Sequence, residues 1–276
     1  MADTQASLTQ SPVILDKRSI ATSFSRAASR YDSMAMIQRQ VGSKLLHLSR
    51  QRLQGQVLDL GCGTGFFSSE LLQLSNVEAV LAVDLAEGML SYGRHNRAHP
   101  DIDWICADAE SLPFADGSVD AVFSNFSIQW CENLTALFAE VNRVLKPGGM
   151  LVFTTLGPDT LKELRYAWAQ VDDYVHVNKF QPWSCLQRSL AMGFQSIYVE
   201  DELIELEYQR LNQLTGELKG IGAHNLNQGR ITGLAGRQRI QAFRQAYESL
   251  RKENGLLPAT YQLFYGIYQK TALTVA

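Results

Sequence analysis

Three closely spaced glycines follow a short apolar run that contains one carboxylate. Gly61, Gly63 and Gly65 alternate with other residues, and Asp59 lies two positions before the first of them. Glycine at such a turn lets a ligand approach the backbone where a Cβ would block it. Dinucleotide sites space these glycines as G-x-G-x-x-G. Here Phe66 occupies the position of the third dinucleotide glycine, and the Asp59 carboxylate would repel a pyrophosphate and attract an ammonium group.

A cationic, phosphate-free nucleoside therefore fits this turn better than a dinucleotide, and S-adenosylmethionine is such a ligand. Asp84 ends the next buried strand and can accept hydrogen bonds from both ribose hydroxyls, although it could also cap the helix that follows. Leu85 and Met89 begin that helix and can sandwich an adenine ring. Met89 could equally be an ordinary core residue.

Two later strands end in polar residues that could complete the same site. Asp108 ends the third strand and can accept a hydrogen bond from the exocyclic amine of adenine, while the backbone N–H of Ala109 can donate to a ring nitrogen. A turn aspartate is the simpler explanation of Asp108. Asn125 and Phe126 follow the fourth strand and are expected at the methionine end of the cofactor. Further residues should face the methyl acceptor, namely Gln129 and Trp130.

These residues are positioned by an alternation of strands and helices, which is typical of a doubly wound α/β fold whose ligands bind at the carboxyl ends of the strands. The apolar runs predict seven strands in a mostly parallel sheet, with helices at 66–74 and 132–145. The second helix should end at a Lys-Pro-Gly-Gly stop. The strands are expected at 57–60, 79–84, 103–109, 119–124, 150–155, 197–206 and 259–272.

The chain of 276 residues suits one large domain with additions. Residues 1–15 are expected to be disordered, and residues 16–276 to form a single domain. Within it, residues 16–54 should form an N-terminal helical lid, and residues 208–254 a basic helical insertion before the last strand. The lid carries Tyr31, which could orient the methyl acceptor or simply pack in the apolar face of the lid.

Charge is unevenly distributed along the chain. The first 54 residues hold eight Lys or Arg and three Asp, residues 55–209 hold eight basic and 22 acidic residues, and residues 210–252 hold eight basic and two acidic residues. The two basic blocks could bind an acidic partner, or they could be ordinary solvated helix faces.

Composition excludes several other classes of protein. Hydrophobic residues make up 46% and charged residues 19% of the chain, as in a globular protein. No apolar run approaches the ~18 residues of a membrane span, and neither a membrane nor a nucleic acid is expected as a partner. Four scattered cysteines without C-x-x-C spacing indicate a reduced, cytoplasmic enzyme. His95 and His99 lie four residues apart, but no third ligand is near, so no metal site is expected.

The run at 59–65, Asp-Leu-Gly-Cys-Gly-Thr-Gly, resembles motif I of the class I S-adenosylmethionine-dependent methyltransferases. Other segments resemble one family of that class, the malonyl-[acyl-carrier protein] O-methyltransferases of the biotin pathway. These segments lie at 24–31, 124–130, 153–156 and 218–223. The resemblance implies the class I fold, S-adenosylmethionine as cofactor, and methyl transfer to the free carboxylate of malonyl-[acyl-carrier protein]. The resulting methyl ester primes pimeloyl synthesis for biotin.

The same resemblance implies an acidic carrier protein as partner, with malonyl-coenzyme A as a further acceptor. The carrier is expected to dock on the densest group of arginines in the insertion, which comprises Arg230, Arg237, Arg239 and Arg244. Two alternatives remain open from the residues. One is a methyltransferase acting on another small carboxylic acid or on a quinone, and the other is an inactive regulatory subunit that only binds the cofactor.

Overall fold

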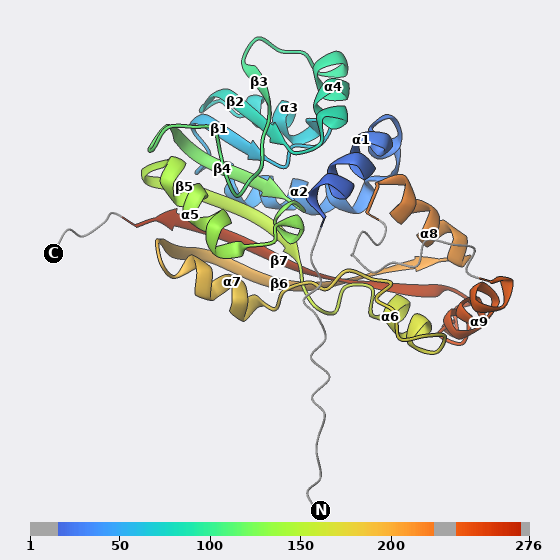
Figure 1. Cartoon of the computed structure of the whole chain (residues 1–276). Coiled ribbons are helices and arrows are strands. Elements are labelled where there is room, and N and C mark those ends of the chain that lie inside the picture. Colours follow the sequence, from blue (N-terminus) through green and yellow to red (C-terminus); the bar gives the residue numbers. More distant parts are fainter. Residues whose placement is uncertain (1–15, 224–235, 272–276) are drawn as a thin grey trace, which may run out of the picture.

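The computed structural model describes residues 16–223 and 236–271. Within these residues the fold is a seven-stranded sheet in the order β3-β2-β1-β4-β5-β7-β6 (Figure 1). The first five strands of this order run parallel, and β7 is antiparallel to both β5 and β6. The mostly parallel α/β sheet predicted from the sequence is therefore confirmed. The strands are β1 Gly55–Leu60, β2 Val77–Asp84, β3 Ile102–Cys106, β4 Val119–Asn125, β5 Leu145–Leu156, β6 Phe194–Tyr208 and β7 Leu257–Lys270.

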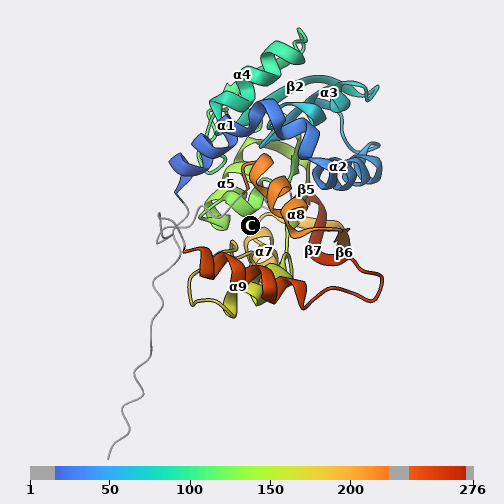
Figure 2. The same cartoon turned by 90° about the vertical axis from the view of Figure 1, so that its right-hand side faces the viewer.

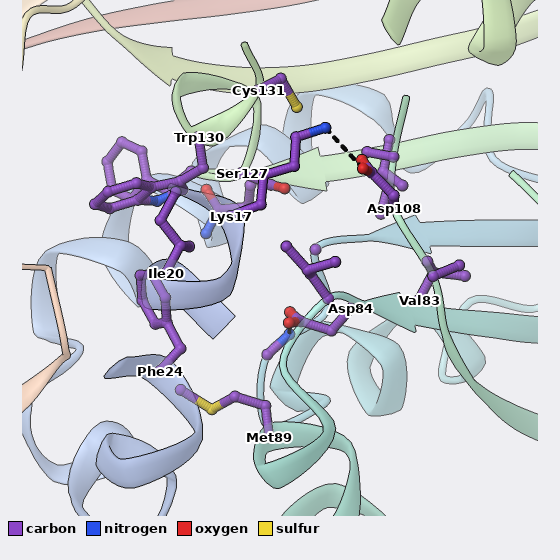
Figure 3. A pocket seen from close by; sticks show the side chains of 18 of the residues that line it. Lys17, Ile20, Phe24, Val83, Asp84, Met89, Asp108, Ser127, Trp130 and Cys131 are labelled. Atoms are coloured by element: carbon purple, nitrogen blue, oxygen red, sulfur yellow. Dashed lines mark hydrogen bonds and ion pairs between the residues drawn. The ribbon is translucent and has the colours of Figure 1, made fainter. Parts of the chain in front are cut away.

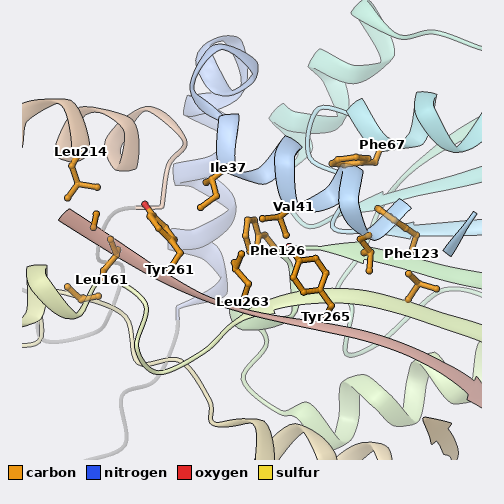
Figure 4. Close-up of a cluster of buried hydrophobic side chains, with 14 of the residues drawn as sticks. Ile37, Val41, Phe67, Phe123, Phe126, Leu161, Leu214, Tyr261, Leu263 and Tyr265 are labelled. Carbon is orange, nitrogen blue, oxygen red and sulfur yellow. The ribbon is translucent and has the colours of Figure 1, made fainter. Parts of the chain in front are cut away.

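Helices cover both faces of the sheet. Because side chains alternate along a strand, Val57 packs toward α2 and α3, whereas Leu58 packs toward α5 and α7. Figure 4 shows part of the first face, where Val41 of α2 and Phe67 of α3 lie near Phe123 of β4. The helices are α1 Lys17–Met34, α2 Met36–Ser49, α3 Phe66–Leu72, α4 Glu87–Asn96, α5 Leu134–Val144, α6 Lys162–Ala169, α7 Trp183–Leu190, α8 Leu211–Gly220 and α9 Arg237–Glu248, with a 3-10 turn at Ile128–Trp130.

The N-terminal helix α1 is held against the carboxyl edge of the sheet by contacts with α4. Buried Ala27 and Ala28 pack on Ala86 and Met89. The Oγ of Ser25 accepts a hydrogen bond of 3.1 Å from the backbone N–H of Gly88. A Cβ on Gly88 would come within 2.6 Å of the Ser25 Cβ, so close packing requires glycine there. Small residues on both helices thus fix the predicted lid over the turns after β1 and β2.

A half-buried carboxylate also ties the lid to the glycine turn. The Thr64 hydroxyl donates to Asp32 of α1 at 2.7 Å, and Arg97 donates to the other Asp32 oxygen at 2.6 Å. Charge-assisted hydrogen bonds thus join α1 to the glycine turn and to the end of α4, although these segments are far apart in the sequence. These hydrogen bonds therefore help to hold the lid against the glycine turn.

Several predicted boundaries differ from the structure. Helix α5 ends at Val144 and strand β5 begins at Leu145, so the Lys-Pro-Gly-Gly stretch lies inside the strand. The cause is an irregular register, in which Leu145 pairs with Val119 and Met150 with Ala121, leaving the intervening residues to bulge. The predicted basic insertion contains α8 and α9, and its residues 224–235 lie outside the described part of the chain.

Candidate functional site

A cavity opens at the carboxyl ends of β1, β2 and β4, beneath α1. Most of the residues expected to bind the cofactor line it (Figure 3). Among those residues are Gly61, Gly63, Asp84, Leu85, Met89, Asp108, Ala109, Asn125 and Phe126. Tyr31 and Trp130, which were expected beside the methyl acceptor, line it too. The structure therefore gathers, around one cavity, residues that span nearly 100 positions of the sequence.

The glycine turn has a backbone that favours glycine at each expected position. Gly61 and Gly63 have φ angles of 75° and 56°, in the left-handed region. A Cβ on Gly61 would lie 2.1 Å from the Ser127 hydroxyl, so a side chain there would displace the exit of β4. Apart from Tyr31 Cε1 at 4.0 Å, nothing lies close to a Cβ built on Gly63. Glycine at 63 is thus explained by its backbone angle and by the open space that it leaves for a ligand.

Asp84 anchors this turn. One carboxylate oxygen accepts from the Gly63 N–H at 2.8 Å, and the other accepts from the Ala86 N–H at 2.8 Å. Burial raises the pKa of Asp84, while these two N–H groups oppose that effect. Since each carboxylate oxygen can accept a second hydrogen bond, Asp84 can hold the turn and still accept from two ribose hydroxyls.

Asp59 occupies a different position from the one that its charge suggested. It is only 2% exposed and does not line the cavity. The Ser68 hydroxyl of α3 donates to it at 2.6 Å. Burial raises the pKa of Asp59 to about 7, despite this hydrogen bond. Its contact with a cofactor ammonium stays a prediction.

Asp108 is paired with a residue that sequence analysis missed. The Lys17 ammonium, at the start of α1, lies 2.7 Å from Asp108 Oδ2 (Figure 3). It also lies 3.1 Å from Glu110 Oε1. Lys17 therefore closes the end of the cavity where an adenine is expected. No local pattern could reveal this pair, because its members lie 91 positions apart in the sequence.

A second cavity adjoins the first and shares four aromatic lining residues with it, namely Phe24, Tyr31, Phe126 and Trp130. The rings of Phe24 and Trp130 meet edge to face, with centroids 5.2 Å apart. The second cavity is otherwise lined largely by apolar side chains of α8, β7 and the segments on either side of α6. We refer to it as the acceptor cavity.

Two of the expected site residues, Gln129 on the acceptor side and Asn125 on the cofactor side, also have structural partners. Gln129 lines the acceptor cavity, but it donates to the Phe126 carbonyl at 2.7 Å and accepts from the Thr155 hydroxyl at 3.2 Å. Asn125 donates to the Gln38 carbonyl of α2 at 3.0 Å and accepts from the Thr154 hydroxyl. These amides therefore fix the exit of β4 and join it to the lid.

The acceptor cavity also holds unpaired polar atoms and strained backbone. Gln38 Oε1 and Asn178 Oδ1 are buried without a hydrogen-bond partner, and both residues line this cavity. Phe126 and Leu161 line it too, and they are the non-glycine residues with positive φ in the described chain, at 54° and 56°. Unsatisfied buried groups and strained backbone both concentrate at functional sites. Sequence patterns gave no sign of Gln38 or Asn178.

Tyr31 lines both cavities, in agreement with its expected place in the lid. Burial raises the pKa of Tyr31 far above its usual value, and the nearby Asp84 carboxylate adds to the effect. The phenol is therefore neutral at any ordinary pH and can donate a hydrogen bond, but it cannot serve as a ready base.

The arginines expected to dock a carrier lie elsewhere. Arg230 falls outside the described residues. Arg237 and Arg244 are exposed on α9, whereas Arg239 forms an ion pair with Asp172 and lies over the Tyr174 ring. Helix α9 packs on α6, and none of its residues lines either cavity. A docking role for this group stays a prediction.

Two other expectations concern metals and membranes. In the described residues, no three His, Cys, Asp or Glu side chains come together as a metal site. No described helix has both the length and the apolar character needed to cross a membrane.

Residues 58–153 match the family model described as a methyltransferase domain. Among solved structures, a Bacillus halodurans protein assigned as a methyltransferase superposes with a TM-score of 0.61 at 18% identity, covering 84% of this chain and 99% of that one. The [4+2]-cyclase SpnF superposes with a TM-score of 0.52 at 20% identity, covering 83% and 81%. Such low identities show the fold alone. With the matching domain, they define the chain as a methyltransferase of the class I fold.

Closer relatives identify the family. The malonyl-[acyl-carrier protein] O-methyltransferase of Yersinia pestis is 41% identical over 93% of this chain and 92% of its own length. The Methylovorus protein of the same name is 41% identical over 98% of this chain and 94% of its own. The chain belongs to this malonyl-[acyl-carrier protein] O-methyltransferase family. The bifunctional biotin biosynthesis protein BioHC of Cellvibrio japonicus is 48% identical over 91% of this chain, which spans half of that longer relative.

Proposed function

We propose that this protein transfers a methyl group from S-adenosylmethionine to the free carboxylate of malonyl-[acyl-carrier protein] in biotin synthesis. The observation that carries the proposal is the pair of adjoining cavities with a shared aromatic wall. One cavity suits a nucleoside and the other an acyl thioester. A methyl donor and its acceptor can therefore meet at the residues common to both.

The lining of the first cavity fits the cofactor. Asp84 would hold the ribose hydroxyls, Leu85 and Met89 would enclose the adenine, and Asp108 would accept from its amine. The cofactor supplies an electrophilic methyl group on a sulfonium. Lys17, now paired with Asp108, would neutralise part of the carboxylate charge beside an uncharged base. The other end of the cofactor would lie near Asn125, Phe126 and the glycine turn.

The lining of the acceptor cavity fits a carboxylate nucleophile. Its described residues include no Asp, Glu, His or Lys that could act as a general base. A carboxyl group with a reference pKa of about 4 is already ionised near neutral pH and needs none. Attack on a sulfonium cancels charge, so a largely apolar lining that excludes water favours the reaction. The neutral hydroxyl of Tyr31 can orient the carboxylate without binding it too tightly.

The unpaired amides fit the rest of the substrate. A phosphopantetheine arm carries amide N–H groups, which could donate to the buried oxygens of Gln38 and Asn178. Satisfying a buried orphan acceptor is worth about 1–3 kcal/mol per group. We therefore place the arm along the acceptor cavity. Malonyl-coenzyme A carries the same arm, and we propose it as a weaker acceptor.

The alternatives make different demands on the site. Methylation of a quinone precursor, at a ring carbon or at a phenol oxygen, needs a general base. The described lining residues of the acceptor cavity include no Asp, Glu, His or Lys for that role. A regulatory subunit that only binds the cofactor would have no need for a second cavity against the same aromatic wall. We further propose that residues 16–276 act as one domain and that the enzyme works in the cytoplasm, where its four free cysteines stay reduced.

An acceptor panel tests the proposed function. Purified protein and methyl-labelled S-adenosylmethionine are incubated with malonyl-carrier, malonyl-coenzyme A, acetyl-carrier, free malonate and a quinone precursor. We expect the highest kcat/KM with malonyl-carrier, a lower value with malonyl-coenzyme A, and no transfer to acetyl-carrier. Preferred labelling of the quinone precursor, or no labelling of any acceptor despite cofactor binding, would refute the proposal.

A further inference from the structure

A row of arginines follows one exposed face of α1. Arg18, Arg26 and Arg30 are separated by multiples of four residues, so they project from the same side of the helix over roughly 18 Å. Together with Lys219 of α8 they line a groove between the two helices, which lie side by side in Figure 2. No acidic residue is among its described lining residues. Ser19, Thr22, Ser23 and Met34 also contribute to the groove.

Helix stability does not explain this row. Like charges four residues apart, as in Arg26 and Arg30, destabilise a helix by a few tenths of a kcal/mol. Arg18 lies in the first turn, where the helix dipole disfavours a cation. In the described part of the chain, Arg26, Arg30 and Lys219 form no ion pair, unlike Lys17 and Arg39 on neighbouring positions of the lid.

The groove and the acceptor cavity lie on opposite sides of the contact between α1 and α8. On the inner side of α1, Phe24 and Tyr31 line the acceptor cavity, and Leu218 and Ile221 reach it from the end of α8. The two helices are closely joined there, because the Ser23 hydroxyl donates a hydrogen bond of 3.0 Å to the Gly222 carbonyl. Gly222 has a φ of 78°, and a Cβ there would meet Ala27 at 3.3 Å. The segment at 218–223 is thus the joint between α8 and the lid.

We propose that this basic groove is the docking surface for the acidic carrier protein, an inference that rests on the proposed function. The carrier's surface charge would match Arg18, Arg26, Arg30 and Lys219. Its arm would then need to pass only about the width of one helix, roughly 10 Å, to enter the acceptor cavity. By contrast, α9 lies away from α1 in both overall views (Figures 1 and 2) and packs against α6.

Three charge-reversed pairs in the full-length protein test the groove. The first is Arg26→Glu with Arg30→Glu. The second is Arg237→Glu with Arg244→Glu on α9. The third, a matched control outside both surfaces, is Arg50→Glu with Arg52→Glu at the exposed end of α2. Each pair changes the net charge equally. The KM of each variant is measured for malonyl-carrier and for malonyl-pantetheine, which has the arm without the protein, at two salt concentrations.

We expect the groove pair alone to raise the KM for malonyl-carrier, by about tenfold at low salt and less at high salt, because steering by charge weakens with salt. Its KM for malonyl-pantetheine and its affinity for the cofactor should stay at wild-type values. A rise confined to the α9 pair, a similar rise in all three pairs, or an equal loss with both substrates would overturn the proposal. Failure of the proposed function is separate, because the wild-type protein would then not methylate malonyl-carrier at all.

Discussion

Replacing Asp84 by asparagine separates the two tasks that the structure gives this carboxylate. Asp84 accepts from the Gly63 and Ala86 N–H groups, both at 2.8 Å. Alanine would leave both donors unpaired and destabilise the fold by about 1–3 kcal/mol for each. Asp84→Asn keeps the side-chain shape and one carbonyl oxygen, so it preserves more of the turn while removing the charge.

The expected loss of cofactor affinity follows from the hydrogen bonds. A hydrogen bond to a charged acceptor contributes about 1.5–3 kcal/mol, and one between neutral groups about 0.5–1.5 kcal/mol. The amide of Asn can accept at one oxygen only. We therefore expect Asp84→Asn to weaken cofactor binding by about 2–3 kcal/mol, which is roughly 30- to 150-fold in Kd.

Calorimetry with S-adenosylhomocysteine and its 2′-deoxy analogue isolates the ribose contact from any damage to the turn. The wild-type protein should prefer the hydroxylated ligand by about 10-fold or more, and Asp84→Asn should lose most of this preference. Equal binding of both ligands by the wild type, or an undiminished preference in the variant, would refute the role of Asp84.

Three further substitutions test other parts of the site. Tyr31→Phe should lower kcat about tenfold or more without changing cofactor affinity, because the neutral hydroxyl orients the acceptor; normal turnover would leave Tyr31 with a packing role only. Gln38→Met should stabilise the ligand-free protein to thermal unfolding by about 1 kcal/mol, because it removes a buried oxygen that has no hydrogen-bond partner. The same substitution should raise the KM for malonyl-pantetheine. Lower stability with an unchanged KM would contradict the role of Gln38. Burial raises the pKa of Asp59 from 3.8 to about 7, so the folded state holds the proton of this carboxyl group more tightly than the unfolded state. The contribution of Asp59 to the free energy of unfolding should therefore fall as the pH rises between these two pKa values and stay level at higher pH. Asp59→Asn should therefore be more stable than the wild type by about 2–4 kcal/mol near pH 8 and lose that slope in thermal unfolding, and it should bind the cofactor more weakly if the ammonium contacts Asp59. An unchanged pH profile would contradict the raised pKa.

Local patterns predicted the parts of the site that belong to the sheet. The glycine turn, Asp84 and Asp108 follow apolar strands, and parallel strands bring their carboxyl ends to one edge. Their positions around one cavity could therefore be expected from spacing alone. Asp59 was harder to place, because the charge that marks it in the sequence does not show which way a strand residue points.

Contacts between distant segments could not be predicted in this way. Lys17 meets Asp108 across 91 positions, and Asn178 reaches the acceptor cavity from an irregular segment without periodicity. The same limit applies to docking. Charge density along the chain marked both the N-terminal block and the insertion as candidate docking segments, but it could not show that residues of α1 and α8 come together in one groove.

The most direct test of the account is the mass and chemistry of the product formed on the carrier. Malonyl-carrier is incubated with the enzyme and S-adenosylmethionine, the intact carrier is weighed by mass spectrometry, and its acyl-pantetheine group is fragmented to locate the added mass. The account predicts a gain of one CH₂ on the malonyl group, carried as a methyl ester that loses methanol on fragmentation, and no gain on acetyl-carrier. A methyl group on the central carbon of the malonyl group, or one that also appears on acetyl-carrier, would contradict methylation of the free carboxylate.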